Sequence, residues 1–365
     1  MKSKPSETLF APLAFTRYEA NQTLPEKFSR LLKKSDIAKK LKGKSVAIKM
    51  HVGDNISYST IPPIFVRKLV DFVKESGGNA FITDHYMHAR NPENRGYSES
   101  ALGCPVVDVC GHLGKYFYTK PVHFRSLKEV DVAGLIHDAD FLIDFSHVKG
   151  HGACGFGGAC KNIAMGCVTD RTRHALHGLE GGLVWNEKKC TRCDKCIKSC
   201  NHHANSFDKD GKYNVFYHNC TLCQHCAKVC PVKAITLDSN NYEDFQTGMA
   251  ICTKTVLDSF APDCTYYINV LTSITALCDC WGMTTPSLVP DIGIIAGNDM
   301  VAVEKASIDA IKIENLIPEG LPRGLKLEGN GHLFERLHGK NPYTQLEKLV
   351  EQGLGSLDYK TVVVS

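Results

Sequence analysis

Apolar and polar positions in the first part of the chain predict a strand, a helix and a second strand. Residues 45–53 and 79–84 are apolar, β-branched runs typical of buried strands. Between them, residues 64–76 carry apolar side chains at helical spacing, at Phe65, Leu69 and Phe72, and the pattern ends at two glycines. A strand–helix–strand order is typical of a parallel sheet covered by helices.

The same pattern returns further along the chain. Residues 139–145, 266–277 and 291–296 are expected to form strands, and residues 300–311 and 333–352 helices, the last of them peripheral. We therefore predict an α/β fold with a mostly parallel sheet and flanking helices. A cysteine-rich stretch interrupts it, so the expected division is a first α/β part at 1–181, an insert at 182–240 and a second α/β part at 241–365.

The number and spacing of the cysteines add most to this prediction. The chain has 17 cysteines, an odd number on a chain too long for a secreted disulfide scaffold, so we expect a cytoplasmic protein whose clustered thiols bind metal. An internal repeat, with each cysteine of the second run 30 positions after its counterpart, indicates two copies of one structural unit. The two runs are Cys190, Cys193, Cys196 and Cys200, then Cys220, Cys223, Cys226 and Cys230.

The spacing of these runs resembles that of a bacterial ferredoxin with two [4Fe–4S] clusters. In such proteins the last cysteine of each run ligates the cluster held by the other run. The resemblance implies a small α+β ferredoxin-like insert with one cluster on Cys190, Cys193, Cys196 and Cys230 and the other on Cys220, Cys223, Cys226 and Cys200. Structural zinc is the alternative, but a zinc site closes with four ligands from two cysteine pairs, whereas each run here already supplies four.

The densest polar stretch outside the insert is the glycine-rich segment 146–167. It follows a predicted strand, the position at which α/β proteins usually bind ligands. We predict that it forms a catalytic pocket from Lys149, His151, Lys161 and Asn162. The two lysines would favour an anionic substrate, and His151 would donate a proton because histidine ordinarily titrates near neutral pH. The alternative is a tight glycine connection without a ligand.

Several cysteines lie outside the two runs. Cys167 closes the glycine-rich segment, and Cys278 and Cys280 lie one residue apart on another predicted loop, so these three are candidate ligands for an additional metal or cluster. A lone cysteine is more often a small buried hydrophobic residue. We prefer that interpretation for Cys104, Cys110, Cys252 and Cys264.

The order of these segments resembles the family named domain of unknown function 362. The resemblance rests on VAIKMHVGD, KGHGACGFGGACKNIAMGC, the ferredoxin-like runs, CDC and VPDIGIIAGND. The family pattern corresponds here to Lys149, Gly150, His151, Gly157, Gly158, Lys161, Asn162, Cys167, Cys278, Cys280 and Asp291. Cys154, Cys160 and His85 depart from it. The resemblance implies an α/β iron–sulfur protein and names no substrate.

Charge narrows the range of functions. The chain has 43 Lys and Arg and 39 Asp and Glu, a net charge of +4, which gives little support for nucleic-acid binding, and no apolar run suits a membrane span. We expect an iron–sulfur reductase that passes single electrons to a small substrate. The alternatives are a metal or cluster carrier and an electron-transfer module, whose redox partner protein would dock on Lys188, Lys189, Lys195 and Lys198.

Overall fold

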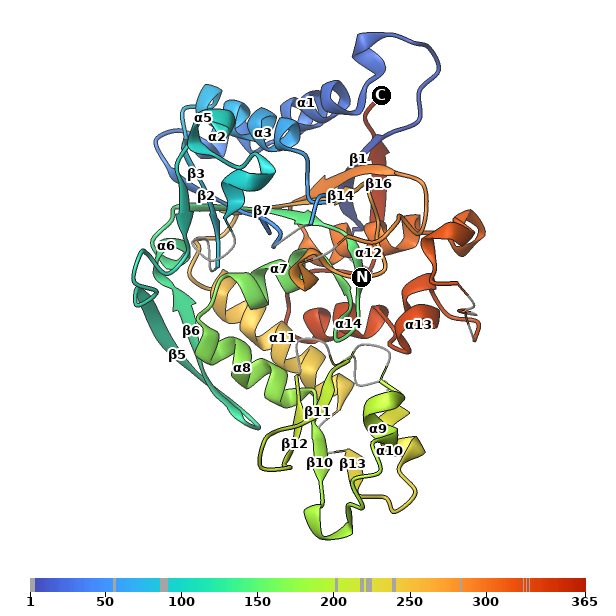
Figure 1. The fold of residues 1–365 in the computed structure, drawn as a ribbon. Coiled ribbons are helices and arrows are strands. Elements are labelled where there is room, and N and C mark those ends of the chain that lie inside the picture. Colours follow the sequence, from blue (N-terminus) through green and yellow to red (C-terminus); the bar gives the residue numbers. More distant parts are fainter. Residues whose placement is uncertain are drawn as a thin grey trace.

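The protein is built on one large, mostly parallel sheet, seen in the computed structural model (Figure 1). The structure describes residues 4–54, 57–85, 91–200, 203–216, 220, 225–237, 241–282, 284–323, 325, 327 and 329–365. Within the described strands of this sheet, β15 alone runs against its neighbours. In spatial order they are β16 (Tyr359–Val363), β1 (Ser6–Pro12), β15 (Gly293–Gly297), β14 (Thr265–Leu271), β7 (Phe141–His147), β2 (Ser45–Lys49), β3 (Asn79–Asp84) and β4 (Val106–Asp108).

Helices cover both faces of this sheet because successive strand residues point to opposite sides. Val46 and Ile48 belong to one hydrophobic core, whereas Ala47 between them belongs to the other. The first face is covered by α1 (Leu24–Lys34), α2 (Ala38–Leu41), α3 (Pro63–Glu75) and α5 (Glu99–Leu102). The second is covered by α6 (Gly134–His137), α7 (Ala159–Gly166), α8 (Asp170–Leu179), α11 (Tyr242–Leu257), α12 (Met300–Ala310), α13 (Leu333–His338) and α14 (Tyr343–Glu351). The predicted α/β class is confirmed.

Four small two-stranded sheets also lie within the described part of the chain. Two are hairpins of the α/β part, β5 (Phe117–Phe124) with β6 (Leu127–Ala133) and β8 (Lys149–His151) with β9 (Gly155–Gly157). The others lie in the cysteine-rich segment, which Figure 1 shows beyond α8 and α11. They are β10 (Leu183–Trp185) with β13 (Ile235–Leu237) and β11 (Asn205–Phe207) with β12 (Tyr213–Val215).

The cysteine-rich segment leaves the α/β part and returns to it at one place, because its first strand pairs with its last. Its short helices are α9 (Lys195–Lys198) and α10 (His225–Val229). It has a small core of its own, in which Cys196, Tyr213, Cys226 and Ile235 are buried. The division of the chain at 182 and 240 stays a prediction about folding units.

Two sequence predictions about secondary structure are wrong. The glycine-rich segment 146–167 is not a loop: it contains the β8–β9 hairpin and α7. The predicted helix at 333–352 is two helices, interrupted at Gly339, whose φ of 68° is left-handed, and at Pro342. It is not peripheral either, since Leu346 and Leu349 are fully buried in the core.

The start of α7 is held by a carboxylate from another helix. Glu304 on α12 is fully buried, and its Oε1 accepts the backbone N–H of Cys160 at 2.8 Å, in the first turn of α7. Gly158 precedes this turn, and a Cβ there would come within 2.4 Å of the Glu304 carboxylate. Glycine at this position thus lets the carboxyl oxygens of Glu304 approach the free N–H groups of the helix.

Replacing Glu304 with Gln is expected to make thermal stability less dependent on pH. Burial raises the pKa of Glu304 to about 8, against about 4.3 in an unfolded chain. The folded protein therefore holds a proton that the unfolded chain releases, and the stability it contributes is lost as pH rises through that interval. Circular dichroism should show a larger fall in melting temperature between pH 5 and pH 8 for the wild type than for the Gln variant. Equal falls would contradict this role.

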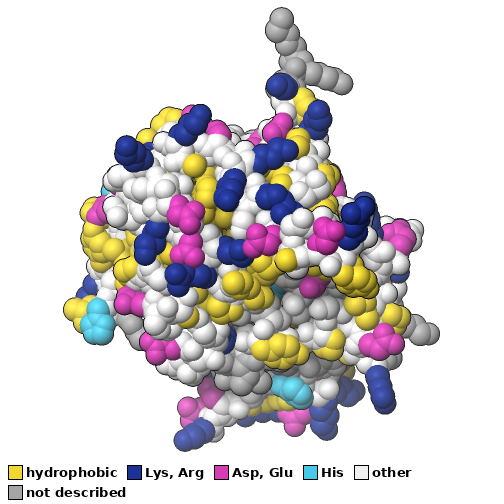
Figure 2. Space-filling view, turned by 90° about the horizontal axis from the view of Figure 1, so that it is seen from above, with side chains coloured by type: hydrophobic (Ala, Val, Ile, Leu, Met, Phe, Trp, Pro, Cys, Tyr) yellow, Lys and Arg dark blue, Asp and Glu magenta, His cyan; other side chains and the backbone are white. Residues whose placement is uncertain are grey.

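No helix among the described residues combines the length and the apolar character needed to cross a bilayer. On the face seen in Figure 2, lysine and arginine side chains are interspersed with aspartate and glutamate. Neither charge sign forms a continuous stripe over that face.

Candidate functional site

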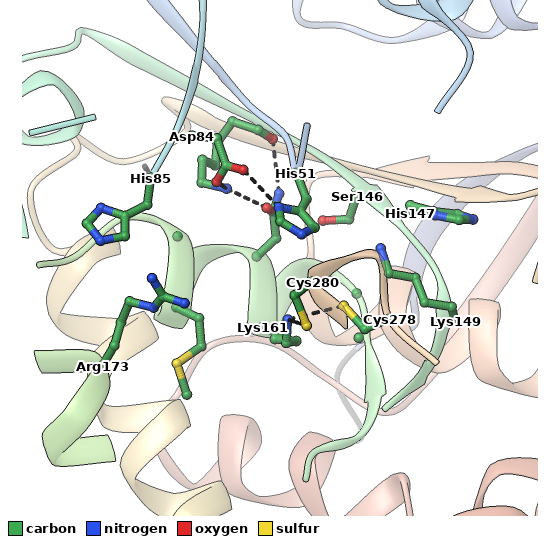
Figure 3. Close-up of a pocket in the computed structure, with 16 residues that line it drawn as sticks. His51, Asp84, His85, Ser146, His147, Lys149, Lys161, Arg173, Cys278 and Cys280 are labelled. Carbon is green, nitrogen blue, oxygen red and sulfur yellow. Dashed lines mark hydrogen bonds and ion pairs between the residues drawn. The ribbon is translucent and has the colours of Figure 1, made fainter. Parts of the chain in front are cut away.

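A polar cavity of about 40 Å3 lies where the parallel strands β2, β3 and β7 end (Figure 3). Its size admits small groups, on the scale of a few water molecules. The glycine-rich segment contributes Lys149, Lys161 and Asn162, and a distant turn contributes Cys278 and Cys280. The structure thus brings together at one cavity two sequence segments that were predicted separately.

The thiols of Cys278 and Cys280 share one buried ammonium group. Lys161 Nζ donates to Cys278 Sγ at 3.3 Å and to Cys280 Sγ at 3.6 Å. Burial by itself raises the pKa of Cys278, but the Cys280 hydrogen bond and the Lys161 and Lys149 charges outweigh it and hold this pKa well below its ordinary value. Burial would lower the pKa of Lys161, yet the two sulfurs raise it above its usual value. The geometry therefore favours a thiolate paired with an ammonium ion.

His151 lies against the same sulfurs. Together with Cys278 and Cys280 it forms a group that could hold a metal ion, with the ligand atoms within 4.8 Å of one another. However, His151 Nδ1 accepts the backbone N–H groups of Ala153 and Cys154, at 3.0 and 3.1 Å. The proton of a neutral ring must then be on Nε2, which faces Cys280 Sγ at 3.6 Å. A ligating histidine normally has the opposite arrangement, with its second nitrogen donating.

The expected role of His151 as a proton donor stays a prediction, and its surroundings do not favour a protonated ring. Burial, reinforced by the Lys161 charge, lowers the pKa of His151 well below its usual value, so the ring is neutral at neutral pH. A neutral ring with its proton on Nε2 donates a hydrogen bond to the Cys280 sulfur instead. It stabilises negative charge on the thiol pair.

Lys149 points into the cavity from β8 and is already paired. Its Nζ donates to Asp279 Oδ2 at 2.8 Å, and the same oxygen is 2.8 Å from His147 Nδ1. Burial raises the pKa of Asp279, but Lys149 and His147 outweigh it and hold the pKa well below its ordinary value. Asp279, which separates the two cysteines, was not given a role of its own in the sequence analysis. Because Lys149 and Lys161 both face buried anions, the preference for an anionic substrate is weaker than their presence in the sequence suggests.

The side-chain amide of Asn162 holds neighbouring residues in place, because both its oxygen and its nitrogen form hydrogen bonds with them. Its Oδ1 accepts Lys49 Nζ at 2.6 Å, and its Nδ2 donates to Lys49 O at 3.0 Å and to Asp144 Oδ2 at 2.9 Å. Lys49 also pairs with Asp84, at 2.9 Å. Burial raises the pKa of Asp144 to about 7. Lys49 and Asp144 could have been found in the sequence, because each is a charged residue inside an otherwise apolar predicted strand.

Cys167 is not part of the thiol group. It follows α7 and is fully buried in the core with Cys110 and Met165. Burial raises the pKa of Cys167, and the described metal-ligating group around Cys278 does not include it. Cys104, Cys110, Cys252 and Cys264 are all buried, as predicted.

In the cysteine-rich segment, four predicted cluster ligands surround one small cavity: Cys190, Cys193, Cys196 and Cys230. Three backbone N–H groups of this segment point at predicted ligand sulfurs. Ala204 N donates to Cys200 Sγ and Ala234 N to Cys230 Sγ, both at 3.2 Å, and Arg192 N donates to Cys190 Sγ at 3.4 Å. Such hydrogen bonds are typical of iron–sulfur ligation, where they stabilise the thiolates. The residues present therefore fit a cluster.

The second predicted ligand set is described in part. Cys200 and Cys220 are half-buried and Cys226 is buried, whereas Cys223 lies outside the described residues. The two Ala–Cys hydrogen bonds repeat at the 30-residue offset seen in the sequence. The internal repeat is therefore also a structural one at these positions.

A chain of hydrogen bonds connects the end of the cysteine-rich segment with the thiol pair. Tyr242, the first residue of α11, donates from its hydroxyl to Cys154 O at 3.1 Å. Cys154 N donates to His151 Nδ1, and His151 Nε2 faces Cys280 Sγ. Nothing in the sequence singled out Tyr242, which is the second residue after the predicted insert.

Asp291, the last residue of the family pattern, lies elsewhere. It borders a groove of about 600 Å3 with a largely apolar lining that includes Leu13, Phe15 and Tyr18. Its Oδ1 accepts the backbone N–H of Ser273 at 2.6 Å. Asp291 therefore shapes the turn after β14 and does not reach the thiols.

The model of the family described as domain of unknown function (DUF362) matches residues 46–309. The chain belongs to this family. The match spans both flanks of the cavity and the cysteine-rich segment between them, and it confirms the family predicted from the sequence. The family description names no activity.

Comparisons with individual proteins add little to the family match. No curated protein matches the chain. The solved structure of the lactate racemase apoprotein from Thermoanaerobacterium thermosaccharolyticum is 12% identical, with a TM-score of 0.38, over 73% of this chain and 50% of that one. A protein from Thermotoga maritima is 11% identical, with a TM-score of 0.36, over 69% of this chain and 50% of that one. The chain thus spans about half the length of these structures.

Proposed function

We propose that the protein is an iron–sulfur oxidoreductase with a redox-active thiol pair, Cys278 and Cys280, at the polar cavity. The observation that supports it best is the hydrogen-bond chain from Tyr242 through Cys154 and His151 to Cys280. It starts two residues after the predicted end of the insert, at the first residue of α11, and ends at the thiols.

Two [4Fe–4S] clusters are the proposed cofactors, and each exchanges one electron when bound. Cys190, Cys193, Cys196 and Cys230 would hold one, and Cys200, Cys220, Cys223 and Cys226 the other. The N–H···S hydrogen bonds and the cavity lined by the first four support this assignment.

The residues around the cavity keep the thiol pair reactive. Lys161 and His151 Nε2–H both stabilise negative charge on the sulfurs, and Lys149 adds a second cation nearby. When the Cys278 thiolate and the Cys280 thiol join as a disulfide, they release two electrons and one proton, so the pair can exchange electrons with a small substrate in the cavity. The attraction of a small anion to Lys161 is limited while the thiolate is present, because the thiolate already neutralises this lysine.

An electron-transfer module for a redox partner is the second candidate function. It is favoured by one observation: Lys188, Lys189, Lys195 and Lys198, near the predicted cluster ligands, are all exposed. An acidic partner protein would be attracted to such a surface, and binding would weaken with salt. In that case the thiol pair would have no role in turnover.

Iron and sulfide analysis tests the iron–sulfur assignment. Anaerobically purified protein is expected to contain about eight iron and eight acid-labile sulfide per chain. Cys190→Ala should lose at least about four of each. The control Cys252→Ala removes a fully buried thiol of the α/β core and should keep them all. Colourless, iron-free wild-type protein would refute the proposal.

The same analysis separates a thiol pair from a third cluster. A Cys278→Ser/Cys280→Ser double variant should keep all the iron of the wild type. A wild-type content near twelve iron that falls by about four in this variant would show that the two cysteines ligate a cluster, and the thiol-pair role would be wrong.

A further inference from the structure

A second group of potential metal ligands lies apart from the thiol pair. His85, Asp108 and Cys110 are all buried, and their ligand atoms lie within 4.8 Å of one another. His85 follows β3, and Asp108 ends the neighbouring parallel strand β4, in register with Asp84. The group therefore sits at the same sheet edge as the cavity, where ligand-binding residues of α/β proteins collect.

A carboxylate orients the histidine of this group. His85 Nε2 lies 3.1 Å from Asp170 Oδ1, at the start of α8. An acidic partner on Nε2 favours the tautomer with its proton there, so that Nδ1 carries the lone pair. This carboxylate–histidine arrangement is the usual one behind a metal-binding imidazole. It is the reverse of the arrangement at His151, whose Nδ1 accepts two backbone N–H groups.

The other two ligands are held together by the backbone. Asp108 Oδ1 accepts the N–H of Cys110 at 2.9 Å, so the carboxylate and the thiol lie on the same short turn. Only 8% of Asp108 and 1% of Cys110 is exposed. A metal ion bound here would have a carboxylate and a sulfur as ligands from one turn, and it would compensate the buried charge of Asp108.

We propose that His85, Asp108 and Cys110 bind one divalent transition-metal ion of the zinc type. The ligand set is one nitrogen, one oxygen and one sulfur, which suits zinc and not the oxygen-selective magnesium or calcium. Three protein ligands leave a fourth position for water or a substrate, as in catalytic zinc sites. His85 also lines the polar cavity, so the ion would lie beside the cavity wall.

Metal analysis of the cluster-loaded protein tests this site. Anaerobic wild-type protein, incubated with zinc chloride and desalted, should retain about one zinc per chain alongside its iron. Cys110→Ser and His85→Gln should each lose that zinc, with at least about tenfold weaker binding, and keep the iron content. Cys104→Ser is the matched control, because Cys104 is a buried thiol six positions away that is absent from the group.

Zinc absorption-edge spectroscopy distinguishes this site from the thiol pair. The expected shell has one sulfur at about 2.3 Å and nitrogen or oxygen at about 2.0–2.2 Å, whereas zinc on Cys278 and Cys280 would show two sulfurs. Zinc that persists in Cys110→Ser and His85→Gln, or that disappears from the Cys278→Ser/Cys280→Ser variant, would overturn the proposal. If Cys110→Ser does not fold, Asp108→Asn and His85→Gln give the same test. Because iron is counted in each sample, failure here is distinct from failure of the iron–sulfur proposal.

Discussion

Replacing Lys161 with Met is expected to slow the alkylation of Cys278 by iodoacetamide at pH 7 by on the order of 100-fold, because the thiolate is the nucleophile. Lys161 Nζ lies 3.3 Å from Cys278 Sγ in a buried site, and its charge helps to hold the pKa of that thiol below its usual value. Without the ammonium group, burial dominates and the pKa rises, and each unit above the working pH reduces the thiolate fraction tenfold. Peptide mass spectrometry of the labelled protein measures the rate at this one cysteine.

The pH profile makes this prediction specific. The wild-type rate should depend less on pH between pH 6 and pH 9 than the rate of the Met variant, because the lowered pKa of Cys278 keeps more of this thiol ionised at the lower pH values. Lys161→Arg keeps a positive charge and should stay within about tenfold of the wild type. Lys254→Met, which removes an exposed lysine paired with Asp258, should change nothing. Equal rates and profiles for the wild type and Lys161→Met would show that the ammonium group does not activate the thiol.

Replacing Asp279 with Asn should destabilise the folded protein by about 3–5 kcal/mol, the usual effect of removing one partner from a buried ion pair. Asp279 is 1% exposed, and its Oδ2 accepts Lys149 Nζ and lies against His147 Nδ1, both at 2.8 Å. An amide leaves these groups buried without a counter-charge. For a chain of this length, the melting temperature should fall by about 4–6 °C.

The difference in melting temperature between the wild type and Asp279→Asn should disappear at acidic pH. The pKa of Asp279 in the folded protein is well below its ordinary value, so the stability that its carboxylate contributes is fully present above about pH 4. That stability is lost as pH falls toward the folded-state pKa, and the gap between the two melting curves should narrow there. Asp258→Asn breaks an exposed pair with Lys254 and should move the melting temperature by no more than about 1 °C. A gap that is constant with pH would mean that the charge of Asp279 is not what stabilises the fold.

Much of the fold follows from local patterns. The strand at 79–84 and the helix at 300–311 match β3 and α12 to within a residue, because their apolar positions fall on faces that the sheet buries. The prediction for the glycine-rich segment was wrong because it has no such regular pattern. Glycines interrupt its apolar positions, so its hairpin and helix leave little periodic signal. They form because Gly150 packs against the Ala276 carbonyl and Glu304 binds the start of α7.

In the candidate site, too, some residues were found from the sequence and others only from the structure. Cysteine spacing predicted cluster ligands in the insert, because a metal cluster needs its sulfurs at short and fixed separations, and this assignment stays a prediction. Lys149 and Lys161 were found because their segment follows a predicted strand, where α/β proteins usually bind ligands. Their partners were not, since Asp279 and the Cys278 sulfur approach from a turn more than a hundred residues away.

The linear order of residues was therefore sufficient for the fold class and the family, both of which depend on short-range spacing, whereas the repeated cysteine ligands stay a prediction. Only the tertiary structure determines which charged side chains are in contact. It pairs each cavity lysine with a buried anion and places a backbone N–H pair on His151 Nδ1. Protonation in a buried site depends on its nearest neighbours in space, so the chemistry of the thiol pair was set by contacts between distant segments.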